Sequence, residues 1–192
     1  MAQPVIEGGS GIGGSLSTDE GSRLTSERPR PSIKVRQPLL SEILDKVHRA
    51  KNKADKVAIL KEDQCEALQQ ICQWAFNPTI TSALPPGNPP YIENDAPEGT
   101  EHTLLRTEGN SLWHFVNVNG KPADPNIQKT VMERMFIRLL EGLHKDEAEL
   151  LCMVKDKKLV YNQKEKTGIK GLSVPILQEA FNWDENFRKK VV

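Results

Sequence analysis

Apolar residues recur along this chain at the spacing of one helix face. Leu39, Leu40, Ile43, Leu44 and Val47 follow the i, i+3/i+4 pattern of an amphipathic helix. A second run of this kind lies in 64–76, where five apolar side chains share one face: Ala67, Leu68, Ile71, Cys72 and Ala75. Asn77-Pro78 ends it, because a residue before proline disfavours the α conformation. These patterns predict a helical body.

Further helices are predicted at 54–60, 101–116, 124–142, 148–154 and in a segment capped by Ser173. In the fourth, Gly109 is a weak point because glycine disfavours helix. Asp124-Pro125 has the form of a helix start, with Asp as N-cap and Pro at the first helical position. No alternating pattern indicates a strand. We therefore expect an all-α domain of six to seven helices over residues 38–192.

A proline-rich connection at 77–101 interrupts the helical pattern. Its centre, Leu84 to Tyr91, reads Leu-Pro-Pro-Gly-Asn-Pro-Pro-Tyr and is incompatible with a helix or a central strand. Long loops of this kind are often functional. We favour an ordered strap that Leu84, Tyr91 and Ile92 pack onto the helices, with a functional loop as the alternative.

Residues 1–37 are rich in Gly, Ser, Pro and Arg and have too few large apolar groups to offset the entropy of ordering. We expect a flexible tail. Gly9 to Gly14 matches G-x-G-x-x-G, but the strand and helix of a dinucleotide site are missing around it. The basic segment from Arg28 to Arg36 is either a solvated linker or a peptide that docks on nucleic acid or on a partner.

The composition argues against several classes of function. The 26 basic and 26 acidic residues balance, which disfavours an extended nucleic-acid footprint but leaves room for a local basic patch. The three cysteines have no metal-site spacing and the four histidines are scattered, so we expect no metal and no cofactor.

Glu98, Glu101 and His102 are interpreted as helix capping rather than acid–base chemistry. No apolar run approaches the roughly 20 residues of a membrane span, and we expect a soluble protein.

The segment 155–173 is the strongest candidate for binding. Its lysines outnumber its two acidic residues, and glycines beside them allow close backbone approach. Lysines followed by a helix N-terminus suit phosphate groups. The alternative is a solvated loop. The candidate nucleic-acid-binding residues are Lys155, Lys157, Lys158, Lys164, Lys166, Lys170, Gly171 and Ser173.

Longer motifs carry a resemblance to known proteins. They are Leu39 to Leu44, Ala83 to Tyr91, Asn94 to His102 and Leu140 to Leu150. The region 38–187 resembles a family of small proteins of T4-like tailed phages, especially those of cyanobacteria, that has no assigned function. This resemblance implies a location in the host cytoplasm or in the virion.

A second resemblance rests on the order of elements from Leu139 to Phe181: a leucine-rich helix, a basic loop, a Gly-Leu-Ser turn and a final helix. This order resembles the end of the helical N-terminal DNA-binding domain of ATP-dependent DNA ligases. That resemblance implies contacts to the backbone of duplex or nicked DNA. Lysines replace the arginine-rich segment of that domain, and residues 163–169 look inserted.

No enzyme chemistry accompanies the ligase likeness. The nearest match to the K-x-D-G motif of ligases is Lys53-Ala54-Asp55-Lys56, which lacks the glycine. We expect a non-catalytic phage accessory protein that binds DNA through phosphates without base readout. One alternative is a virion or assembly component whose tail orders on a neighbouring subunit. Another is a binder of a host enzyme.

Overall fold

Helices dominate the computed structural model, which describes residues 37–95, 97 and 102–190. In chain order they are α1 (Leu40–Arg49), α2 (Lys53–Glu62), α3 (Glu66–Phe76), the 3-10 helix η1 (Glu108–Phe115), α4 (Lys129–Gly142), α5 (Lys145–Lys155) and α6 (Val174–Phe181). The prediction of a helical body is confirmed. The tail motifs at 9–14 and 28–36 lie outside the described residues, as do Glu98 and Glu101.

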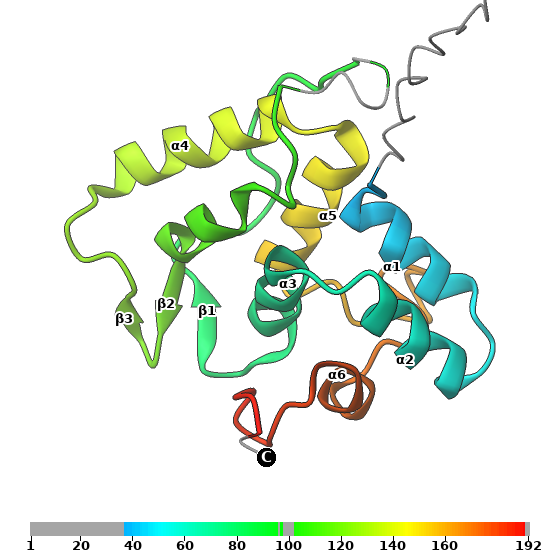
Figure 1. Cartoon of the computed structure of the whole chain (residues 1–192). Coiled ribbons are helices and arrows are strands. Elements are labelled where there is room, and N and C mark those ends of the chain that lie inside the picture. Colours follow the sequence, from blue (N-terminus) through cyan, green and yellow to red (C-terminus); the bar gives the residue numbers. More distant parts are fainter. Residues whose placement is uncertain (1–36, 96, 98–101, 191–192) are drawn as a thin grey trace, which may run out of the picture. The chain divides into compact units, whose positions relative to one another are not determined.

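The prediction that the domain is purely helical is wrong, because a small antiparallel sheet is present. Its strands β1 (Ile80–Ser82), β2 (Val116–Val118) and β3 (Lys121–Pro122) lie in the order β1-β2-β3 (Figure 1). Thr81 pairs with Asn117, and Val118 pairs with Lys121. The β2–β3 turn is Asn119-Gly120, and both residues have positive φ, at 52° and 77°. This is the sequence that tight hairpin turns favour.

The predicted fourth helix is shortened at its N-terminal end to η1, and the fifth helix begins at Lys129 rather than after Asp124. Asp124 is used locally instead. One of its oxygens lies 2.7 Å from Nδ1 of His114, and the other accepts the backbone N–H of Asn126 at 3.0 Å. A side-chain turn of this kind competes with helix initiation. The prediction of Asp124 as an N-cap is therefore wrong.

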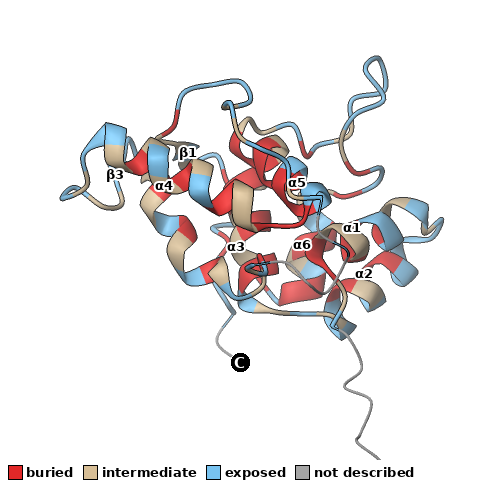
Figure 2. Cartoon of the chain, turned by 90° about the horizontal axis from the view of Figure 1, so that it is seen from above, coloured by how far each residue is buried: buried red, intermediate tan, exposed pale blue. Residues whose placement is uncertain are grey.

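The buried side chains join the helices into one core (Figure 2). α2 packs against α1 and α6, while α3 packs against η1 and α5. Gly109 of η1 lies so close to α3 that a Cβ on it would come within 2.9 Å of the Cα of Ala67. Glycine has no side chain, so it lets η1 and α3 pack this closely. This packing offsets the low helix propensity of glycine.

The proline-rich strap is ordered over its described part and runs past α4 and α5 (Figure 1). Leu84 is buried and Tyr91 is half-buried, as expected of its anchors. Ile92 is 79% exposed, so the prediction that it packs onto the helices is wrong. The strap therefore has anchors at Leu84 and Tyr91, with exposed prolines between them.

Candidate functional site

The basic segment between α5 and α6 forms a folded loop. Val160 and Ile169 form a β-bridge, as do Asn162 and Thr167. The backbone N–H of Ile169 donates to the carbonyl of Leu159 at 2.9 Å, and both side chains are buried. This apolar base fixes where the exposed tip of the loop lies.

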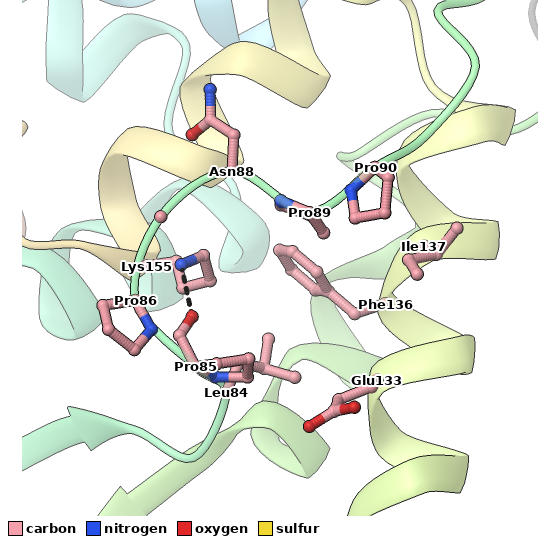
Figure 3. Close-up of a pocket in the computed structure, with 11 residues that line it drawn as sticks. Leu84, Pro85, Pro86, Asn88, Pro89, Pro90, Glu133, Phe136, Ile137 and Lys155 are labelled. Atoms are coloured by element: carbon pink, nitrogen blue, oxygen red, sulfur yellow. Dashed lines mark hydrogen bonds between the residues drawn. The ribbon is translucent and has the colours of Figure 1, made fainter.

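Lys155 lies inside the molecule and faces the strap. Its Nζ donates to the carbonyl oxygen of Pro85 at 2.9 Å (Figure 3) and to the carboxylate of Asp156. Only 1% of the Lys155 side chain is exposed. Because its ammonium is held by these two groups, Lys155 is not part of the basic surface that the sequence analysis predicted.

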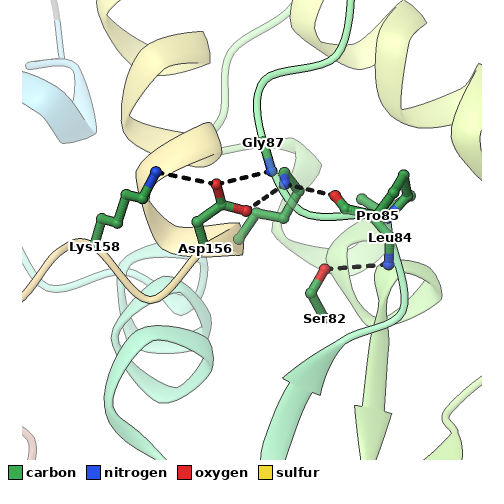
Figure 4. A network of polar contacts seen from close by, with 7 residues as sticks. Ser82, Leu84, Pro85, Gly87, Asp156 and Lys158 are labelled. Carbon is green, nitrogen blue, oxygen red and sulfur yellow. Dashed lines mark hydrogen bonds and ion pairs between the residues drawn. The ribbon is translucent and has the colours of Figure 1, made fainter.

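Lys157 and Lys158 also hold internal partners at the start of the loop. Nζ of Lys157 donates to the carbonyl of Asn77 at 2.8 Å, and burial lowers the pKa of this lysine below its usual value. Lys158 lies 3.5 Å from Asp156 while most of its side chain stays exposed. Asp156 in turn accepts the backbone N–H of Gly87 at 3.1 Å (Figure 4). Lys155, Asp156 and Lys157 thus tie the strap to the end of α5.

The other three lysines, Lys164, Lys166 and Lys170, are exposed. Within the described part of the chain, no hydrogen bond or ion pair engages their side chains. Glu165 is the acidic residue between them. The loop therefore carries a local excess of positive charge, although the whole chain is neutral.

The base of this loop is joined to the end of α1. The backbone N–H of Lys170 donates to Nδ1 of His48 at 3.2 Å, and the ring of His48 lies edge-on to Tyr161 with centroids 6.2 Å apart. We define the basic surface as Lys164, Lys166 and Lys170. His48 anchors its base as a hydrogen-bond acceptor, across more than 100 positions of sequence, and periodicity alone could not have revealed this contact.

Lys56 of α2 holds the end of α1 and the base of the basic loop together. Its Nζ donates to the carbonyls of Val47 at 2.6 Å and Lys170 at 2.9 Å. Burial, and then the charge of Lys170, lowers the pKa of Lys56 below its usual value. Gly171 has a φ of +74°, and a Cβ there would lie 2.9 Å from Nζ of Lys56. Gly171 therefore serves the packing of this junction.

Ser173 occupies the N-cap position of α6, as predicted, but its hydroxyl makes no capping hydrogen bond. Its carbonyl accepts the N–H groups of Ile176 and Leu177 at 3.0 and 3.1 Å. Ser173 is half-buried and follows directly on the Gly171 turn. The start of α6 therefore lies next to the basic surface along the chain.

Ile169, which precedes Lys170 in the chain, is one of the residues that line an acidic hollow of about 310 Å³. Four carboxylates line it, from α1 and α5: Glu42, Asp45, Asp146 and Glu149. These carboxylates would repel a polyanion such as DNA. The hollow therefore limits how far a polyanion can extend from the basic surface.

A second cavity, of about 240 Å³, lies between the strap and α4 (Figure 3). Leu84, four strap prolines, Phe136 and Ile137 form its apolar walls, and Glu133 and Lys155 are its charged members. The proline-rich sequence indicates a functional loop as one alternative for the strap, but nothing in it points to a residue of α4. The run of prolines is the sequence signal for this cavity.

The described residues hold no group of three or more His, Cys, Asp or Glu side chains arranged for a metal ion. The cysteines 65, 72 and 152 are free thiols, two of them buried and Cys65 partly so. None of the helices in the described ranges is long and apolar enough to span a bilayer.

No curated protein and no solved structure matches the sequence. The likeness to the ligase domain therefore stays a prediction. One family model matches residues 43–161, which is more than half of the chain and includes most of α1, all of α2 to α5, the sheet and the strap. The chain belongs to DUF6433, a family of unknown function.

Proposed function

We propose that this protein is a non-catalytic accessory protein that binds duplex or nicked DNA through backbone phosphates at the basic surface. The observation that carries the proposal is that Lys164, Lys166 and Lys170 are exposed, free of side-chain partners among the described residues, on one loop anchored to the core. The resemblance to small proteins of T4-like phages supports an infected host cell as the place where it acts.

Anchoring matters because it reduces the entropy lost when the lysines meet DNA. The buried side chains of Leu159 and Ile169 and the bond from Lys170 to His48 hold the loop before binding. Lysine ammonium groups are point charges that contact phosphates without reading bases. The proposal therefore includes affinity for the backbone and no sequence preference.

The footprint on DNA is expected to be short. The neighbouring acidic hollow and the neutral chain oppose a long track of phosphate contacts. With about three phosphates neutralised, the logarithm of the binding constant should fall with the logarithm of salt at a slope of about −0.9 per phosphate. Binding should thus be weak and sensitive to salt.

The test is a titration of the full chain with nicked, intact duplex and single-stranded DNA at low and near-physiological salt. The variant Lys164→Ala/Lys166→Ala/Lys170→Ala should lose most of the affinity and of the salt dependence. A matched control removes the same charge from exposed lysines elsewhere, as Lys121→Ala/Lys129→Ala/Lys145→Ala. Equal losses in both variants, or no binding at low salt, would refute the proposal.

Exposed apolar side chains favour a second candidate function, that of a virion or assembly component. Trp113 is 45% exposed and Val118 is 39% exposed, and both line one hollow with Ile80. A contiguous apolar patch at a surface often marks a contact between proteins. Mass spectrometry of purified particles tests this candidate, because a structural subunit would be present at a fixed copy number.

A further inference from the structure

The cavity between the strap and α4 has the size of a site for a small ligand. Its volume of about 240 Å³ is just below the usual range for ligand pockets, which begins near 300 Å³. It therefore suits one aromatic ring or a short aliphatic chain. Pro85, Pro86 and Pro90 line it and are exposed, so the cavity reaches the surface.

The walls of the cavity are fixed before any ligand arrives. Prolines stiffen the strap, because each has a locked φ angle. The bonds from Lys155 to the Pro85 carbonyl and from Gly87 to Asp156 tie the same segment to α5 (Figure 4). On the opposite side, Phe136 is part of the core and packs edge-on against Phe115, with ring centroids 5.2 Å apart. A ligand would thus enter a preorganised apolar slot.

The two charged residues of the cavity differ in what they can offer a ligand. Lys155 already donates to Pro85 and to Asp156. Glu133 projects from α4 toward the strap at the end near Leu84 (Figure 3), and the described residues provide no hydrogen bond or ion pair to its carboxylate. The unengaged charge of the cavity is therefore negative.

We propose that this cavity binds a small organic cation, with an ammonium group at Glu133 and an apolar body between Phe136 and the strap prolines. A carboxylate and an ammonium form a charge-assisted hydrogen bond, which is stronger than a neutral one. Glu133 would repel an anionic ligand of the same shape. The ammonium of Lys155 would not attract that ligand in its place, because it is already paired. The site is separate from the basic surface and does not depend on DNA binding.

The test is a titration of ¹⁵N-labelled full-length protein with 2-phenylethylammonium, 2-phenylethanol and phenylacetate, which share a phenyl group but differ in charge. The ammonium should shift the amide signals of Gly87, Asn88 and Ile137 with saturation at about millimolar concentration. It should bind about tenfold more tightly than the alcohol, as expected for one hydrogen bond to a charged group. Phenylacetate should bind more weakly than both.

Variants test whether Glu133 causes the preference for the ammonium ligand. Glu133→Gln should remove the advantage of the ammonium over the alcohol while the alcohol still binds. Glu141→Gln, on the same helix but outside the cavity, should leave that advantage unchanged. Ile137→Trp should fill the cavity and weaken both ligands. The proposal is overturned if no ligand gives saturable shifts at these amides, if phenylacetate binds as tightly as the ammonium, or if Glu133→Gln keeps the preference.

Discussion

The carboxylate of Glu147 in α5 accepts the backbone N–H of Leu40 at 2.9 Å, across 107 positions of sequence. Leu40 is the first residue of α1, where backbone N–H groups have no partner within the helix. The second oxygen of Glu147 accepts the N–H of Leu105 at 3.0 Å, and only 1% of Glu147 is exposed. One buried side chain thus joins α1, α5 and the segment before η1.

Glu147→Ala should lower the free energy of unfolding by about 3 kcal/mol, because it leaves two buried backbone N–H groups without an acceptor. Glu147→Gln keeps one acceptor oxygen and should cost about half as much. Denaturant unfolding of the purified variants measures both values. Glu149→Ala is the control, since Glu149 is exposed on the same helix. If Glu147→Ala costs no more than the control, this carboxylate does not support the fold.

Asp156 should make the strap sensitive to acid. Burial alone raises the pKa of Asp156, but the hydrogen bond and charge of Lys155 outweigh it, with help from Gly87 and Lys158, and the resulting pKa lies below the usual value. A carboxyl group whose pKa is lowered by folding stabilises the fold above its unfolded pKa. That contribution is lost as the pH falls through the folded pKa.

Asp156→Asn should therefore destabilise the protein by about 2 kcal/mol at neutral pH. The difference from the natural sequence should shrink as the pH falls below about 4, the ordinary range of Asp. Unfolding curves across this range measure it, with Asp95→Asn in the exposed end of the strap as control. A difference that is constant with pH would show that charge at Asp156 is not the cause.

The helices that the sequence predicts best are those whose apolar faces meet the core directly. The apolar faces predicted for α1 and α3 are buried in the structure. In the region 101–128, a helix is predicted up to residue 116 but a strand begins at Val116, because the apolar residues fit both the helical and the alternating pattern. Val116 and Val118 alternate around Asn117, and Asn119-Gly120 follows as a hairpin turn. The turn signal is local and visible, whereas pairing with β1 is a long-range contact that periodicity does not reveal.

The candidate site shows the same limit for charged residues. Counting lysines identified the loop, but it could not separate Lys155, which is buried against Pro85, from Lys166, which is exposed. That separation depends on where the strap lies. The cavity beside Phe136 was likewise not predictable, because it arises between two segments whose spacing only tertiary packing sets.

Gly109→Ala should destabilise the fold through packing alone. The added Cβ would lie 2.9 Å from both Cα and Cβ of Ala67, closer than these atoms can approach. Overpacking of this kind costs about 1–3 kcal/mol. Ala67→Gly removes one of the two clashing atoms, so the double variant should be more stable than the sum of the single effects. Additive effects would show that the two positions do not touch.

The three thiols should differ in reactivity toward an alkylating reagent. The thiolate is the reactive form of cysteine. Burial raises the pKa of Cys72, and the charge of Cys65 adds to the effect. Burial also raises the pKa of Cys152 to about 11, although Lys155 opposes the shift. Cys65 is only partly buried at the N-cap of α3, where its Sγ accepts the N–H of Leu68.

Iodoacetamide at about pH 8 should therefore give the native protein a single adduct at Cys65, and mass spectrometry after proteolysis identifies the site. In denaturant all three cysteines should react. Cys65→Ser should abolish labelling of the native protein. Because serine is a preferred N-cap, this variant should also be more stable by about 0.5 kcal/mol. Native labelling of Cys72 or Cys152 ahead of Cys65 would show instead that α3 or α5 opens to solvent before the rest of the core.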